Sequence, residues 1–109
     1  MSVQSLGVVP RLFPLILSGE KRSTIRWKEA PIVPGPMLYV CDGAPEQTAL
    51  VEVWRVSSMP LQEAARFLGR EKDWPDPVML EGMREHYPLI GLDEIVDVIE
   101  HHPFSSRPA

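Results

Sequence analysis

The sequence has almost no cysteine and no long apolar run. Cys41 is the only cysteine among 109 residues, so neither a disulfide nor a cysteine-based zinc site can form within one chain. The best candidate for a membrane segment, residues 12–17, is short and interrupted by Pro14, whereas a membrane helix needs about 20 apolar residues. Its flanks lack the basic start and small-residue cleavage site of a signal peptide. These absences favour a cytoplasmic protein without a membrane partner.

Histidine is also scarce, and its positions do not indicate a metal site. His86, His101 and His102 have no carboxylate at a spacing typical of metal ligands. We expect His101 and His102 to form a solvated strand end. The sequence therefore predicts no metal and no cofactor.

The charge is unevenly distributed along an acidic chain. The formal net charge is -4, and nine of the fifteen acidic residues lie between Glu71 and Glu100. In contrast, four of the eleven Lys and Arg residues fall within eight positions, 21–28. An acidic protein is a poor candidate for coating nucleic acid, because such binding depends on many phosphate contacts. A local positive pocket in a negative body suits a small or single-nucleotide anion better than a long duplex.

The pattern of apolar residues predicts a single domain, residues 1–109, of class α+β. Strands dominate, and the absence of alternating strands and helices argues against a doubly wound sheet, so we predict a small mixed β-barrel with flanking helices. Trp27, Trp54 and Tyr39 fall on strand positions typical of a core. We expect helices at 11–18, 60–70 and 77–86, and strands at 22–28, 37–41, 48–56 and 93–101.

The basic segment has the period of two that is typical of a strand. Ser23, Ile25 and Trp27 would form one face. The opposite face would carry cations and a hydroxyl, from Arg22, Thr24, Arg26 and Lys28. Cations on one strand face also protect a sheet edge from pairing with another chain, which is the alternative reading of this segment.

Residues 19–26, GEKRSTIR, resemble the Gly-x-Lys-x-x-Thr-x-Arg signature of the ASCH domain family, which is related to the PUA-like RNA-binding folds. The likeness extends over nearly the whole chain, because the order of the expected elements also agrees. In size and pattern the chain is similar to the small bacterial amidohydrolases of N(4)-acetylcytidine. The resemblance implies a PUA-like barrel, with an activity directed at a modified pyrimidine nucleoside.

The same resemblance implies a catalytic group of a lysine, a threonine and a glutamate from the helical segment. Lys21, Thr24 and Arg26 match the signature residue by residue, whereas Arg22 and Ser23 depart from its usual content. For the glutamate, Glu71 is the candidate in the corresponding region, although the loop length differs.

Elementary chemistry gives each of these side chains a role. A lysine that is partly desolvated and lies beside a cation such as Arg26 has a lowered pKa, so it can act as a base. The Thr24 hydroxyl can then attack an amide carbonyl, and a carboxyl group such as that of Glu71, in its protonated form, can protonate the departing amine. Arg26 can stabilise the oxyanion or hold a pyrimidine carbonyl.

Two further side chains are candidates for substrate binding. Arg22 adds positive charge to the motif. Trp74, in a proline-rich loop close to Glu71, can stack on a base, although it can equally cover the end of the barrel. The expected partner is a small-molecule nucleoside or RNA. A non-catalytic RNA-binding module is the alternative function, and a ribonuclease is a third, for which no histidine pair is placed for acid–base exchange.

Overall fold

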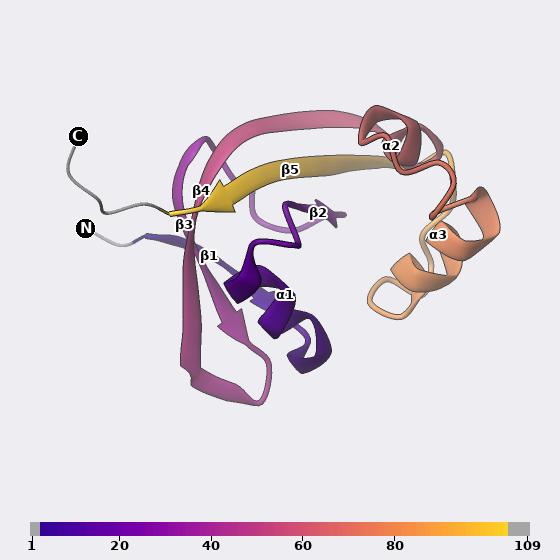
Figure 1. Cartoon of the computed structure of the whole chain (residues 1–109). Coiled ribbons are helices and arrows are strands. Elements are labelled where there is room, and N and C mark those ends of the chain that lie inside the picture. The colour runs from indigo at the N-terminus through magenta and orange to yellow at the C-terminus, as the bar shows by residue number, and fades with distance from the viewer. Residues whose placement is uncertain (1–2, 105–109) are drawn as a thin grey trace. The chain divides into compact units, whose positions relative to one another are not determined.

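The computed structural model describes residues 3–104 of the chain. In this range the elements follow the order β1 (Gln4–Val8), η1 (Pro10–Leu12), α1 (Phe13–Ser18), β2 (Ser23–Arg26), β3 (Gly35–Cys41), β4 (Ala44–Pro60), α2 (Leu61–Phe67), α3 (Asp76–Arg84) and β5 (Ile95–Pro103) (Figure 1). The predicted helices are all present, with shifts of a few residues at their ends. Among the described residues no helix is long and apolar enough to cross a bilayer.

The strands of the described range form one mixed sheet in the order β1-β3-β4-β5-β2. β1 is parallel to β3, with Gln4 opposite Met37 and Val8 opposite Cys41. β3 and β4 are antiparallel, with an irregularity between Val40 and Cys41. A mixed sheet accompanied by helices confirms the predicted α+β class.

The chain divides into two compact units. Within the described range, the first contains residues 3–24, 31–56 and 99–104, and the second contains residues 25–30 and 57–98. Strands β2, β4 and β5 each begin in one unit and end in the other. Each unit has an apolar core of its own.

The first core is built on alternate residues of β3. Met37 and Tyr39 are fully buried and Cys41 is 3% exposed, whereas the intervening Leu38 and Val40 are half-buried. This period of two is the expected one for a strand with one face on a core. Further buried members of this core are Leu6, Val8, Phe13, Ile16, Ile32, Ala49, Val51, Val53 and Ile99.

The second core lies on the helices. Leu61, Ala64 and Ala65 of α2 and Met79 and Met83 of α3 are buried, and their three- and four-residue spacings place them on one face of each helix. Ile90, Val96 and Val98 complete the buried set of this core.

Three strand predictions need correction. β1 was not predicted, because its segment is short and carries a glycine, Gly7, between the two buried side chains Leu6 and Val8. β2 ends at Arg26 rather than at residue 28, because Lys28 has a left-handed backbone with φ 58°. Trp54 was expected in the core, but it is 50% exposed on β4.

Candidate active site

The motif begins in a turn that is fixed on the end of α1. Gly19 has φ 83°, and its N–H donates to the carbonyl of Ile16 at 3.2 Å. The N–H of Lys21 donates to the carbonyl of Leu15 at 3.0 Å. A Cβ at position 19 would lie 3.2 Å from Cγ of Pro103. Glycine is therefore favoured here both by the left-handed backbone and by the lack of space.

Side chains of the motif close the same turn. Lys21 Nζ donates to the carbonyl of Ser23 at 2.6 Å, and Arg22 Nε donates to the carbonyl of Gly19 at 3.0 Å. The carbonyl of Arg22 accepts a bond of 2.9 Å from the N–H of His101 in β5. The lysine is thus held by its main chain and by its amine, immediately before β2.

Thr24 is the buried residue of β2. Its side chain is 7% exposed, whereas its neighbours Ser23, Ile25 and Arg26 are of intermediate exposure. The face that we predicted to be cationic therefore carries its hydroxyl in a sheltered position. A sheltered hydroxyl is better protected from competing water than one on an open strand face.

A buried tyrosine–histidine pair lies in the same unit as Lys21 and Thr24. The hydroxyl of Tyr39 and Nε2 of His101 are 2.7 Å apart, and the two rings meet edge to face with centroids 5.3 Å apart. His101 is only 1% exposed, so the prediction of a solvated strand end was wrong at this residue. β5 lies between β4 and β2 in the sheet, and both of its faces are largely buried around His101.

His101 is electrically neutral at physiological pH. Burial, followed by the positive charges of Lys21 and of His102, lowers its pKa from 6.5 to about 4. Within the described residues, Nδ1 of this ring is buried without a hydrogen-bond partner. The sequence did not single out this pair, and the segment before His101 did not indicate a strand buried on both faces, because Asp97 interrupts the apolar residues of 95–99.

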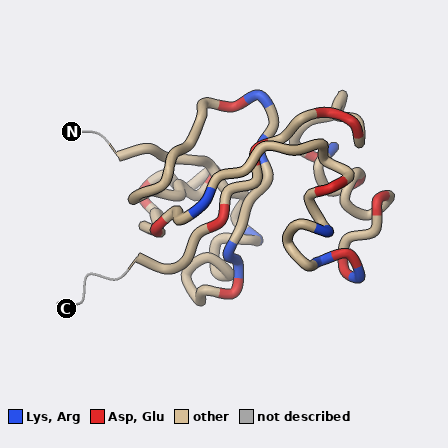
Figure 2. Tube along the Cα trace, turned by 90° about the horizontal axis from the view of Figure 1, so that it is seen from above, with Lys and Arg blue, Asp and Glu red and all other residues tan. Residues whose placement is uncertain are grey.

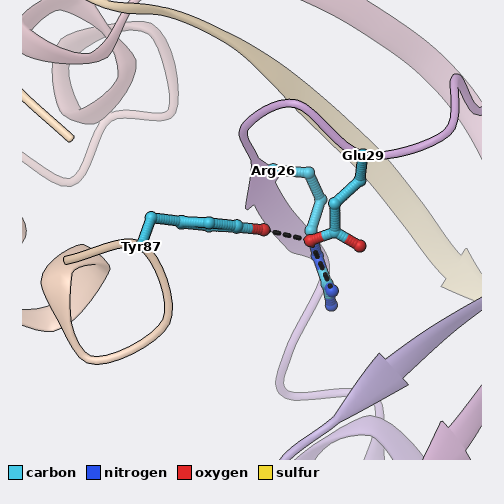
Figure 3. Close-up of polar contacts among 3 residues, drawn as sticks. All are labelled: Arg26, Glu29 and Tyr87. Carbon is cyan, nitrogen blue, oxygen red and sulfur yellow. Dashed lines mark hydrogen bonds and ion pairs between the residues drawn. The ribbon is translucent and has the colours of Figure 1, made fainter. Parts of the chain in front are cut away.

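The second unit contributes Arg26, which is joined to two residues that the sequence analysis missed. Figure 3 shows the guanidinium of Arg26 and the hydroxyl of Tyr87 directed at the carboxylate of Glu29. Arg26 Nη1 lies 3.4 Å from Oε2 of Glu29, and Tyr87 donates its hydroxyl hydrogen to the same oxygen. Trp27 packs edge to face on the Tyr87 ring, with centroids 6.0 Å apart.

Tyr87 holds its proton firmly in this arrangement. Burial raises its pKa to about 12, assisted by the hydrogen bond to Glu29 and by the negative charge of that carboxylate. Tyr87 therefore remains a hydrogen-bond donor throughout the physiological range. No local sequence signal could have revealed the contact, because Glu29 and Tyr87 are 58 residues apart.

Glu71 and Trp74 line a hollow of about 410 Å³ between the end of α2 and the start of α3. Glu71 Oε2 lies 3.7 Å from Arg66 Nε, and the Arg70 guanidinium lies over the Trp74 ring at 4.8 Å from its centroid. This segment carries charges of both signs (Figure 2). The lining residues are Gln62, Glu63, Ala65, Arg66, Glu71, Trp74, Pro75 and Asp76.

The predicted site residues are therefore divided between the units. Lys21, Arg22 and Thr24 belong to the first, while Arg26, Glu71 and Trp74 belong to the second. Between residues 3 and 104 no group of three or more His, Cys, Asp or Glu side chains is arranged to hold a metal ion.

No protein-family model matches the sequence, and no curated protein matches it significantly. Solved structures do match. A mutant of ZmASCH from Zymomonas mobilis has a TM-score of 0.66 at 11% identity, with 90% of this chain and 66% of that chain covered. This chain thus spans just under two thirds of the length of that protein.

Two further solved structures are also similar in fold to this chain. The ASCH domain of Lactobacillus crispatus has a TM-score of 0.57 at 19% identity, covering 85% of this chain and 70% of that one. Protein EF3133 from Enterococcus faecalis has a TM-score of 0.62 at 14% identity, covering 100% and 86% of the two chains. At these identities the likeness concerns the fold, and the chain has the fold of ASCH domains.

Proposed function

We propose that this chain is an amidohydrolase that removes an acyl group from the exocyclic amine of a modified pyrimidine nucleoside, with N(4)-acetylcytidine as the model substrate. The observation that carries the proposal is the geometry of the motif. The Lys21 amine is anchored on the carbonyl of Ser23, directly before the sheltered hydroxyl of Thr24. A lysine and a hydroxyl fixed in adjoining segments are the two components of an activated nucleophile.

The reaction begins with the transfer of the Thr24 hydroxyl proton to a neutral Lys21 amine. The threonine oxygen bonds to the acyl carbonyl carbon, and the carbon–nitrogen bond breaks as the departing amine receives a proton. Water then hydrolyses the threonine ester, which releases the carboxylic acid and restores the hydroxyl. As the ester is cleaved, the hydroxyl of the water joins the acyl carbon, the water's other proton restores the acid that protonated the amine, and Lys21 returns its proton to the threonine oxygen. The net change is one water consumed per amide.

The family resemblance assigns the remaining roles in this proposal to residues of the second unit. Glu71 is the acid that protonates the departing amine, and Arg26 donates hydrogen bonds to a carbonyl of the substrate. Trp74 borders the same hollow as Glu71 and offers a face for base stacking. Arg22 adds positive charge beside the lysine, with its Nε engaged by Gly19.

The direct test is to incubate the purified protein with N(4)-acetylcytidine and to follow cytidine and acetate by chromatography. We expect release of both products by the wild type and loss of most turnover in Lys21→Met. A matched control is Lys72→Met, which removes an exposed lysine outside the motif and is expected to retain turnover. No cytidine release by the folded wild type contradicts the proposal.

RNA binding without catalysis is the second candidate, and exposed aromatic surface on β4 favours it. Trp54 is 50% exposed and the Arg55 guanidinium lies 4.7 Å from its ring centroid, a combination that can stack on an unpaired base. The test measures binding of a single-stranded RNA at several salt concentrations. An affinity that depends on Trp54 and falls steeply with salt, at about 0.7 log units per contacted phosphate for each tenfold increase in salt, together with no turnover, supports this second function.

A further inference from the structure

Glu29 reaches Arg26 through an unusual turn. Lys28, between Trp27 and Glu29, has φ 58°, a conformation that is uncommon for residues other than glycine. The chain reverses here, and the Glu29 carboxylate comes to lie 3.4 Å from the Arg26 guanidinium three residues earlier. A strained backbone of this kind is often retained at functional positions.

The Glu29 carboxylate is bound by a second side chain in addition to Arg26. Tyr87 donates to the same Oε2 that faces Arg26, and its ring is packed against Trp27. Arg26 is 16% exposed at its side chain and Glu29 is 34% exposed, so water screens this pair less than it screens an open surface pair. Within this cluster the positive charge of Arg26 contacts the negative charge of Glu29, and the Lys28 amine lies 4.5 Å from the centroid of the Trp27 ring.

We propose that Glu29, held in place by Tyr87, is a specificity-determining residue that makes Arg26 a ligand for a neutral carbonyl rather than for a phosphate. The assignment of Arg26 to substrate binding rests on the proposed function. A carbonyl oxygen requires only N–H donors, and a guanidinium has five of them. A phosphate gains in addition from uncompensated positive charge, which Glu29 offsets.

The selected substrate class is therefore the uncharged nucleoside, in preference to the same nucleoside carrying a phosphate. Tyr87 is a positioning residue in this scheme, because it acts through Glu29. Its phenol fixes the carboxylate in the orientation in which the carboxylate offsets the charge of Arg26.

The first experiment measures phosphate affinity without requiring turnover. Inorganic phosphate is titrated into the full chain at constant ionic strength, and the side-chain signals of Arg26 and Trp27 are followed by NMR. Glu29→Gln is expected to bind phosphate about three- to tenfold more tightly than the wild type, with the gain shrinking at high salt. Tyr87→Phe is expected to gain about twofold, and Glu29→Asp to restore the wild-type value within about twofold. An unchanged affinity in Glu29→Gln overturns the proposal.

A matched control separates a local effect from one of net charge. Arg70 and Asp73 form another Arg–carboxylate pair three residues apart in the same unit, with Nε and Oδ2 separated by 3.1 Å. Asp73→Asn makes the same change in net charge as Glu29→Gln, and it is expected to leave phosphate affinity at Arg26 within about twofold. An equal gain in both variants overturns the proposal, as does a gain that persists when Arg26→Gln is added to Glu29→Gln.

The second experiment uses turnover and distinguishes this proposal from the proposed function. The ratio of kcat/KM for N(4)-acetylcytidine to that for its 5′-monophosphate is expected to fall about three- to tenfold in Glu29→Gln, chiefly through a lower KM for the phosphate. If the wild type turns over neither substrate, the amidohydrolase proposal fails, while the phosphate titration still decides the role of Glu29. If the wild type is active and the ratio is unchanged, Glu29 does not determine specificity.

Discussion

Each unit of the chain contains a tyrosine hydroxyl bonded to an ionisable side chain, but the two pairs differ in their access to water. Tyr39 and His101 in the first unit are 0% and 1% exposed. Glu29, the partner of Tyr87 in the second unit, is 34% exposed at its side chain and also contacts Arg26. In the first pair burial keeps His101 neutral, whereas in the second pair the Glu29 carboxylate also contacts the positively charged Arg26.

This difference in burial and charge leads us to expect different effects from substitutions in the two pairs. In the first unit the Tyr39–His101 pair is buried, and a low dielectric strengthens the interactions between its members. In the second unit the Arg26–Glu29 pair is charged and partly exposed, so it can meet a ligand. We therefore expect substitutions of Tyr39 and His101 to affect acid stability, and substitutions of Glu29 and Tyr87 to affect recognition.

The largest expected effect concerns the nucleophile of the first unit. Thr24→Val keeps the shape of the buried side chain but removes its hydroxyl, and we expect kcat for N(4)-acetylcytidine to fall about 1000-fold or more. Thr24→Ser retains a hydroxyl and is expected to keep a substantial fraction of the rate. Steady-state kinetics on folded protein provides the measurement. Similar rates for the Val variant and the wild type would remove Thr24 from the role of nucleophile.

The next effect concerns acid stability. The unfolded chain binds a proton at His101 near pH 6.5, while the folded chain binds it only near pH 4. The contribution of His101 to stability is therefore complete above about pH 6.5, declines as the pH falls toward 4, and is lost below it. The loss amounts to about 3 kcal/mol. Urea unfolding at several pH values should show a weaker decline in His101→Gln than in the wild type.

The exposed histidine of the second unit provides the control for this prediction. His86→Gln removes a histidine whose side chain lies in water, and its unfolding free energy is expected to follow the wild-type dependence on pH. The same dependence in the wild type and in His101→Gln would contradict the assignment of a buried, neutral His101.

A smaller effect on the free energy of unfolding is expected when either tyrosine hydroxyl is removed, and the two removals can be compared directly. Tyr39→Phe leaves Nε2 of His101 buried without its bond partner, and this loss is expected to cost about 2 kcal/mol of unfolding free energy. Tyr87→Phe leaves Glu29 in partial contact with water, and its expected cost is below about 1 kcal/mol. Urea unfolding at neutral pH measures both. Equal costs for the two variants would contradict the difference in exposure between the buried Tyr39–His101 pair and the partly exposed Tyr87–Glu29 pair.

The smallest effect is expected from substituting two glycines that have a left-handed backbone conformation, one in each unit. Gly19 has φ 83° and Gly69 has φ 70°, so alanine costs about 1 kcal/mol at either position through backbone strain. At Gly19 the new Cβ would also meet Pro103 at 3.2 Å, whereas nothing lies within 4 Å at Gly69. Gly19→Ala should therefore destabilise the chain by about 1 kcal/mol more than Gly69→Ala. A smaller cost for Gly19→Ala in urea unfolding would contradict this.

Local patterns of the sequence were sufficient for most of the fold. The helix faces of α2 and α3 follow from apolar residues spaced three and four apart, and the turn at Gly19 follows from a glycine after a short apolar helix. β1 could not be identified because its short segment has few apolar residues. Its place in the sheet is set by parallel pairing with β3, 33 residues further along the chain (Gln4 with Met37).

The candidate site was only partly predictable for a similar reason. Lys21, Arg22 and Thr24 were found because their positions follow a contiguous motif. Glu29 was missed because its approach to Arg26 depends on a left-handed Lys28. His101 was misjudged because it lies near the end of the last predicted strand, and strand ends are commonly exposed. A strand with neighbours on both edges can nevertheless be covered on both faces.

The single cysteine has a practical consequence for following motion in this molecule. Cys41 is 3% exposed within the first core, and the second unit has no thiol. A thiol-labelling reagent can therefore modify the native chain only when the first unit opens. The labelling rate under native conditions reports the opening free energy of that unit, without signal from the other and without any engineered probe.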